Sequence, residues 1–142
     1  MEIIELTTIT DNQASDILEL MLELDPEITV TADMLRAVPA SGAHFFAAVD
    51  GGRVVGCATL GVYASPTGLK GHVEDVVVSS SCRGKGLGRL LLEHIISYAR
   101  GLAPIDLHLT SRPAREAANK LYVSLGFARR ETNVYKMVLK KG

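Results

Sequence analysis

The chain has 142 residues, enough for a hydrophobic core, and we expect residues 1–142 to form a single domain. Its 47% hydrophobic and 22% charged residues are usual for a soluble globular protein, and no apolar run approaches the ~20 residues of a membrane helix. A sequence pI of about 6.4 and 5% aromatic residues argue against a nucleic-acid-binding protein.

The net charge of −1 conceals a strong asymmetry along the chain. Residues 1–50 hold ten acidic residues and one basic residue, whereas residues 110–142 hold eight basic and two acidic residues. The basic final third suits a polyanionic cofactor. The acidic first third is either a solvated face or part of a site for a cationic amine.

The cysteines and histidines give no sign of a disulfide framework or a metal site. The two cysteines, Cys57 and Cys82, are too few for a disulfide framework and are typical of a reducing compartment. The first residues lack the basic start and cleavage site of a signal peptide, so we expect a cytoplasmic protein. The four histidines show no metal-ligand spacing, so no metal is expected.

Hydrophobic periodicity predicts the elements of the first half. Asp50-Gly51-Gly52 predicts a tight hairpin between two strands. The expected elements are, in order, a strand at 2–9, a helix capped by Asp11 or Asn12 that carries Ile17, Leu18, Met21, Leu22 and Leu24, a short helix at 31–38 between Thr31 and Pro39, and strands at 45–49 and 54–63.

The second half alternates strands with helices, which predicts a mixed α/β sheet. The expected elements are a strand at 72–79, a helix to about residue 100, a strand at 105–110, a helix from Pro113 to Gly126, and a hairpin of 128–130 with 134–139 that turns at Thr132-Asn133. No internal repeat or linker interrupts this order.

A glycine-rich loop lies between the strand at 72–79 and the following helix, with the sequence Arg83-Gly84-Lys85-Gly86-Leu87-Gly88. Glycines let the backbone approach a ligand closely, and a helix N-terminus favours an anion. Arg83, Lys85 and Arg89 add positive charge at the same place. The segment therefore predicts a phosphate site, with a glycine-rich turn without a ligand as the alternative.

Two common phosphate motifs fit this loop poorly. Gly86 follows Lys85 where a P-loop needs Ser or Thr, and Arg89 stands where a dinucleotide fingerprint needs its third glycine. Asp106 lies about 20 residues on, where a ribose-binding acid would stand. A nucleotide-binding oxidoreductase module therefore remains a weak alternative.

Arg83, Gly86 and Gly88 match the pattern [QR]-x-x-G-x-[GA], which resembles the pyrophosphate loop of the GNAT superfamily of acetyl-CoA-dependent N-acetyltransferases. A later segment resembles the same family: Ala118 and Tyr122 lead to Gly126-Phe127. The resemblance is strong from about His72 to Phe127. It implies a GNAT-like fold of about six or seven strands and about four helices, with splayed central strands.

The resemblance also implies site residues and a co-substrate, acetyl-CoA. The backbone at Val76, Val77 and Val78 would pair with the pantetheine arm, and the loop from Arg83 to Arg89, including Gly84 and Leu87, would bind the pyrophosphate. Asn119 matches a cofactor-contacting position, or else is a helix-surface amide. Tyr122 matches the general acid near the sulfur, or else is a core aromatic.

A strand carboxylate or histidine is the expected base. Alternation places His72, Glu74 and Val76 on one face and Asp75 and Val77 on the other. Glu74 is the first candidate, because a partly desolvated carboxylate beside a cleft suits base work. His72 is the second, acting directly or through a water, and Asp75 is the third.

These observations predict transfer of an acetyl group to a primary amine of a small molecule or peptide by direct attack. A catalytically silent CoA-binding regulatory domain is the alternative. The segment from His72 through the loop most resembles glucosamine-6-phosphate N-acetyltransferases, but Leu107 to Arg112 lacks the acidic residues that those enzymes carry. The family often forms dimers, so the resemblance also allows a homodimer paired through Val134 to Leu139.

Overall fold

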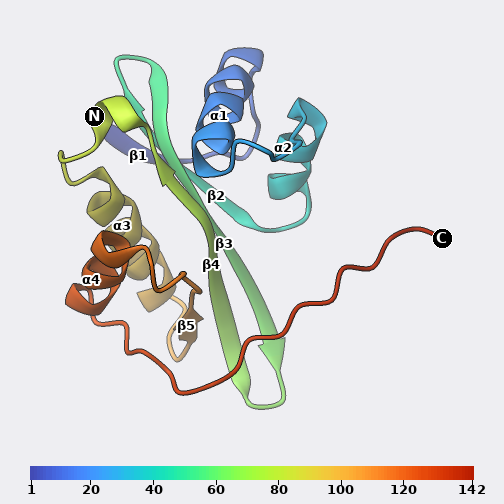
Figure 1. Cartoon of the computed structure of the whole chain (residues 1–142), viewed down its shortest axis with the longest axis vertical. Helices are drawn as coiled ribbons and strands as arrows, with labels where there is room; N and C mark the ends of the chain where they lie inside the picture. The colour runs from blue at the N-terminus through green and yellow to red at the C-terminus, as the bar shows by residue number, and fades with distance from the viewer. The chain divides into compact units, whose positions relative to one another are not determined.

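The computed structural model describes all 142 residues, which form two compact units, residues 1–110 and residues 111–142. The first unit holds five strands and three α-helices (Figure 1). In chain order these are β1 (Glu2–Glu5), α1 (Asp11–Leu24), α2 (Ala32–Ala40), β2 (His44–Asp50), β3 (Arg53–Ser65), β4 (Gly68–Val78), a 3-10 turn η1 (Ser80–Cys82), α3 (Leu87–Arg100) and β5 (Asp106–His108). The second unit holds α4 (Glu116–Ser124). None of the helices combines the length and apolar character needed to cross a bilayer.

The sheet is mixed, as predicted. Its strand order is β1-β2-β3-β4-β5, with antiparallel pairing from β1 to β4 and parallel pairing between β4 and β5. Gly51 and Gly52 close the β2–β3 hairpin with φ values of 56° and 78°, the positive values that a two-residue hairpin turn requires. The predicted hairpin is therefore confirmed.

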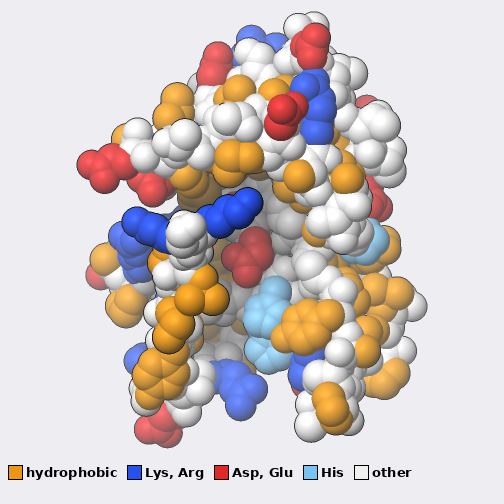
Figure 2. Space-filling model, turned by 90° about the vertical axis from the view of Figure 1, so that its right-hand side faces the viewer, with side chains coloured by type: hydrophobic (Ala, Val, Ile, Leu, Met, Phe, Trp, Pro, Cys, Tyr) orange, Lys and Arg blue, Asp and Glu red, His pale blue; other side chains and the backbone are white.

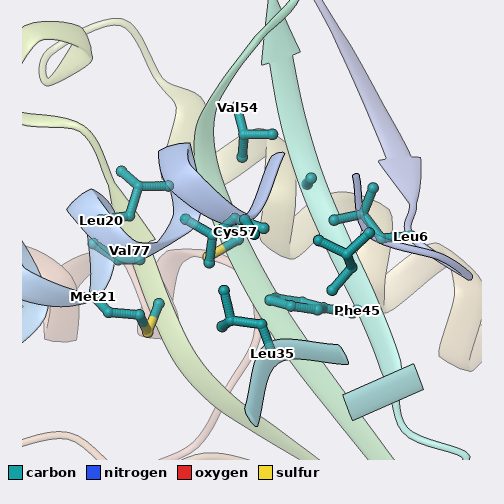
Figure 3. Packing of buried hydrophobic residues seen from close by; sticks show 12 residues of the cluster. Leu6, Leu20, Met21, Leu35, Phe45, Val54, Cys57 and Val77 are labelled. Atoms are coloured by element: carbon teal, nitrogen blue, oxygen red, sulfur yellow. The ribbon is translucent and has the colours of Figure 1, made fainter. Parts of the chain in front are cut away.

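The two faces of the sheet are covered by different helices (Figure 1). Phe45 belongs to the core cluster beneath α1 and α2, with Leu20, Met21 and Leu35 (Figure 3). Its neighbour Phe46 points to the other face, where its ring meets His94 and Tyr98 of α3. Two adjacent phenylalanines thus divide between two cores, because successive strand side chains alternate.

Helix α3 buries one stripe, at Leu87, Leu91, Leu92, Ile95 and Ala99. The close approach of this stripe to the sheet depends on Gly56 of β3. A Cβ there would lie 3.2 Å from the Leu91 side chain and 3.1 Å from the Val77 carbonyl oxygen. A larger residue at Gly56 would push α3 away from the sheet.

Two predicted helix boundaries on the opposite face are corrected. Thr10, not Asp11 or Asn12, caps α1: its hydroxyl accepts from the Gln13 amide while the Gln13 side chain accepts from the Thr10 amide. Thr31 caps α2 as predicted, but Pro39 lies inside its last turn and the helix continues to Ala40. Of the predicted apolar stripe in α1, Leu22 is exposed, whereas Ile17 and Met21 are buried.

A β-bulge interrupts β4 at Asp75 and Val76. Cys57 of β3 pairs with Val77 and Thr59 pairs with Glu74, so two β4 residues lie opposite Ala58. Asp75 adopts φ = 51°, which is uncommon for a residue with a side chain. Simple alternation is therefore wrong beyond Glu74: Val77 lies on the face of His72 and Glu74, in the core beneath α1.

The predicted splay of the central strands is confirmed. β5 pairs with β4 over three residues only, from Lys70 with Asp106 to His72 with His108. Beyond His72, β4 continues to Val78 without β5 beside it. One edge of β4 therefore carries backbone groups that the sheet of residues 1–110 leaves unpaired.

The predicted C-terminal hairpin is wrong, and it accounts for finding five strands where six or seven were expected. Residues 128–142 form no strand, and Val134, Tyr135, Met137, Val138 and Leu139 are exposed. Thr132-Asn133 lacks the glycine that favours a two-residue hairpin turn, and an isolated two-stranded hairpin is marginal in water. Four α-helices are present, as predicted.

Candidate functional site

The glycine-rich loop has the backbone of an anion cradle. Gly84 and Gly86 have φ values of 82° and 75°, in the left-handed region that side chains disfavour. A Cβ built at either position meets nothing within 4 Å, so the surroundings leave room for a ligand. The loop residues Arg83, Lys85 and Arg89 are all exposed.

Helix α3 begins immediately at this loop, with Gly86 as its N-cap. No side chain caps the helix, since glycine has none. The first-turn amides of an α-helix have no partners within the helix, and together with the helix dipole they attract an anion. The predicted phosphate seat therefore has both the conformation and the charge to hold a diphosphate.

Glu23 of α1 ties the segment before this loop to the body of the protein. Its Oε1 accepts a hydrogen bond from the Ser80 amide at 2.8 Å. Hydrogen bonds from the Ser80 side chain and backbone lower the pKa of Glu23, and the charge of Arg83 lowers it further. Sequence reasoning missed this residue, because Glu23 and Ser80 are 57 positions apart.

The three valines assigned to the cofactor lie on the free edge of β4 described above. Val77 is buried, while Val76 and Val78 are half-buried. Their side chains pack in or beside the core while one side of their backbone is open, so packing does not prevent backbone binding, and binding of the cofactor here stays a prediction. An extended amide-bearing ligand can add to such an edge as a further strand.

Of the candidate bases, His72 and Glu74 lie just before the bulge, on the face of α1 and α2, and Asp75 lies in the bulge. Glu74 is exposed and makes no hydrogen bond or ion pair. His72 is half-buried, and its Nε2 lies 3.3 Å from the Tyr63 hydroxyl. Asp75 is exposed, and its main structural distinction is its strained backbone at the bulge.

Two further residues accompany His72. Tyr63 of β3 stacks on one side of its ring and His108 of β5 on the other, with centroid distances of 5.8 and 5.1 Å. Sequence reasoning missed both, although Tyr63 and His108 fall in predicted strands. Their placement depends on strand register, which the pattern alone does not provide.

The cysteines are unsuited to nucleophilic chemistry. Burial raises the pKa of the Cys57 thiol to about 12, and the charge of Asp75 adds to the effect. A thiol with so high a pKa carries almost no thiolate near neutral pH. Cys82 is also buried, in η1 before the loop. Both cysteines are free.

The remaining predicted site residues lie in the second unit, 111–142. The Tyr122 ring meets the Phe127 ring edge to face, with centroids 6.3 Å apart. Asn119 donates both side-chain amide hydrogens, to the carbonyl oxygens of Arg112 and Arg115, each at 2.9 Å. Asn119 thus holds the turn that precedes α4. Its role toward the cofactor and that of Tyr122 in acid catalysis stay predictions.

The chain is similar to known proteins along most of its length. The family model described as "Acetyltransferase (GNAT) family" matches residues 8–127. The chain is 30% identical over 122 residues to the N-alpha-acetyltransferase RimI of Mycobacterium tuberculosis, covering 86% of this chain and 75% of that protein. It is 31% identical over 101 residues to rat N-acetyltransferase 8F1, covering 70% of this chain but only 46% of that protein.

The fold agrees with solved structures. The crystal structure of a Trypanosoma brucei acetyltransferase superimposes with a TM-score of 0.76 at 27% identity, covering 96% of this chain and 99% of that chain. The family match spans the phosphate loop, the open strand edge and α4. From the loop geometry, the splayed sheet and these matches together, we conclude that the chain belongs to the GNAT family of acetyltransferases.

Proposed function

We propose that this protein transfers the acetyl group of acetyl-CoA to a primary amine of a small molecule or peptide by direct attack. The observation that carries the proposal is the continuity of the cradle with the open edge. The free edge of β4 from Val76 to Val78 leads, through η1, into the loop of Gly84 and Gly86. A ligand with an amide-bearing arm and a diphosphate matches this order of features.

Different residues would bind the different parts of acetyl-CoA. The loop amides and the positive charges of Arg83, Lys85 and Arg89 would hold the diphosphate, and the Val76–Val78 backbone would hold the pantetheine amides. The bound co-substrate supplies an activated thioester. Asn119 would add a contact from α4 through its carbonyl oxygen, because its amide hydrogens are used within the turn.

The chemistry requires a deprotonated amine and a proton for the departing thiolate. Glu74, His72 and Asp75 are the groups of β4 that can accept the amine proton. Tyr122 would protonate the thiolate, as its match to the family motif implies. Orientation of two bound reactants contributes a large part of the rate in such a transfer.

The acceptor is an amine, as the family implies. The open face is the part of the α1/α2 face that these helices leave uncovered around His72 and Glu74. Exposed Glu74 and Asp75 add negative charge there, which favours a cationic amine before its deprotonation. The RimI relative is named as an N-alpha-acetyltransferase, so a peptide with a free α-amine is the first acceptor to test. Two free thiols fit a reducing compartment such as the cytoplasm. We further propose that both units form one functional domain and that the chain can form a homodimer.

Two measurements test the function. Thermal shift with acetyl-CoA, CoA and NAD should show stabilisation by the first two only, since binding to the folded state raises its stability. Release of free thiol from acetyl-CoA should then depend on an added amine, with peptides, polyamines and amino sugars as the panel. Stabilisation by CoA without consumption of any amine would leave a CoA-binding regulatory domain instead.

A further inference from the structure

Three aromatic side chains form a row across the open face of the sheet. Tyr63 of β3, His72 of β4 and His108 of β5 stack in that order, with an interplanar angle of 17° at each step. In Figure 2 a pair of histidine side chains lies in the middle of the face, with a hydrophobic side chain beside it and an acidic one close above. His72 is the central member, with an aromatic ring on each side of it.

The strand register explains why the row forms. His72 pairs with His108 on one side and with Gly61 on the other. Tyr63 is the diagonal neighbour of His72 across this pair of strands, within the reach of an aromatic side chain. Strand register therefore brings the phenol to the imidazole.

The hydrogen bond between Tyr63 and His72 relates the tautomer of His72 to the proton-accepting ability of its second ring nitrogen. The Tyr63 hydroxyl lies 3.3 Å from His72 Nε2, and no hydrogen bond engages Nδ1. In neutral imidazole one nitrogen carries the hydrogen and the other carries a lone pair. If Nε2–H donates to the phenol oxygen, the Nδ1 lone pair is left for proton transfer, whereas a phenol O–H that donates to Nε2 puts the hydrogen on Nδ1.

We propose that Tyr63 is a positioning residue that holds His72 in the Nε2–H tautomer, so that Nδ1 is the proton acceptor for the incoming amine. This inference rests on the proposed acetyl transfer. The ammonium N–H bond breaks, its electron pair stays on the amine nitrogen for the attack, and the proton joins the Nδ1 lone pair. The imidazolium returns that proton to solvent after turnover.

His108 supports the same geometry from the other side. Its ring stacks on His72 at 5.1 Å, so His72 cannot swing away from Tyr63 without losing that contact. Nδ1 of His108 is buried and makes no hydrogen bond. A buried polar atom in that state costs roughly 1–3 kcal/mol.

Among the titratable groups around His72, the exposed carboxylates of Glu74 and Asp75 compete with it for the amine proton. Lys70 and Asp106 share its face and are paired in register, but carry charges that suit binding or structure. On α1, the carboxylates of Asp16 and Glu19 face Arg53, and Glu23 accepts from Ser80. The groups around His72 are thus Tyr63, Lys70, Glu74, Asp75, Asp106, His108 and the three α1 carboxylates.

The chain offers a matched control for Tyr63. On the opposite face Tyr98 makes the same type of contact, with its hydroxyl 3.3 Å from His44 Nε2, but His44 Nδ1 also lies 2.8 Å from Glu5 Oε2. Tyr63→Phe and Tyr98→Phe remove the same group at the same distance. Only the first touches the proposed proton acceptor.

Steady-state kinetics and histidine side-chain NMR test the proposal. We expect Tyr63→Phe to lower kcat about three- to tenfold, the effect of one hydrogen bond, with the KM for acetyl-CoA unchanged. Long-range ¹H–¹⁵N spectra should show His72 as the Nε2–H tautomer in the wild type and as a mixture in Tyr63→Phe. Tyr98→Phe should change neither kcat nor the His72 signals.

Each opposing result is decisive. An Nδ1–H tautomer at His72 in the wild type, or a kcat that Tyr63→Phe and Tyr98→Phe lower equally, overturns the role of Tyr63. Tyr63 is 52% exposed, so its substitution should leave the fold intact, and thermal unfolding checks this. Failure of the wild type to acetylate any amine refutes the proposed function instead, and the NMR result still decides the tautomer.

Discussion

Each face of the sheet carries a tyrosine–histidine pair, and the two pairs differ in how far their polar atoms are hydrogen-bonded. On the α3 face, Tyr98 and His44 belong to a filled network in which Glu5 takes the second ring nitrogen and Phe46 packs against both rings. On the open face, Tyr63 and His72 leave the second nitrogen of the histidine unengaged. Full satisfaction of polar groups favours stability, whereas an unused lone pair at an accessible position favours chemistry.

The packed face should show the largest energetic effect. Leu91→Ala removes a fully buried side chain from the interface of α3 with Gly56, and we expect it to lower the free energy of unfolding by about 2–5 kcal/mol. Leu90→Ala is the matched control: that neighbour is 42% exposed and should cost only about 0.5 kcal/mol. Urea denaturation of both variants gives the comparison. Equal losses would mean that the α3 stripe is misassigned.

The open face should show the largest catalytic effect. We expect His72→Gln to lower kcat about 10²-fold, the lower end for loss of a general base, and Glu74→Gln to lower it by less than about tenfold, because Glu74 has no partner that orients it. Both variants should keep the wild-type melting temperature. A larger loss in Glu74→Gln would make the carboxylate the base and reduce His72 to a lining residue.

The glycine-rich loop between η1 and α3, which we propose binds the cofactor, should respond next. Gly86→Ala forces a side chain into φ = 75° at the start of α3, where left-handed backbone costs ~1–2 kcal/mol, and we expect about a 5- to 30-fold weaker affinity for acetyl-CoA as the free loop relaxes out of this conformation. Gly52→Ala imposes a similar strain at φ = 78° in the β2–β3 turn. Calorimetry should show normal affinity for this control. A comparable weakening in both variants would indicate a general loss of folded protein.

Glu23 should give the smallest effect, and one that depends on pH. Hydrogen bonds to Ser80 lower its pKa from the usual 4.5, so its ionised form stabilises the folded state. That contribution is present above the unfolded pKa and is lost as pH falls through the lower folded value. We expect Glu23→Gln to lower the melting temperature by about 2 °C at pH 7, with the difference vanishing in strong acid. A difference that persists in acid would exclude ionisation as its cause.

Those parts of the site that depend only on neighbouring residues in the sequence could be predicted. The glycines and basic residues of the loop, the helix that follows them and the Gly51-Gly52 turn all depend on neighbours within a few positions. The order of the elements through α4 followed from periodicity and turn residues. The cap at Thr10 was missed by one residue, which is the usual error at a helix boundary.

The bulge and the missing hairpin show where local pattern fails. Asp75 looks like any alternating strand residue, yet an extra residue at this point turns Val77 toward the α1 core. Val134 to Leu139 alternates like a strand, but alternation predicts a strand only when another strand accepts its backbone hydrogen bonds.

By itself, the sequence determined where the backbone turns tightly, where the N-terminus of a helix can bind an anion and which family the chain resembles. These properties are set by glycine torsions, helix ends and short motifs, all local. Only the tertiary structure decided that Tyr63 and His108 flank His72 and that Glu23 supports the loop. Those contacts join residues up to 57 positions apart, and strand register and packing, which are cooperative over the whole sheet, bring them together.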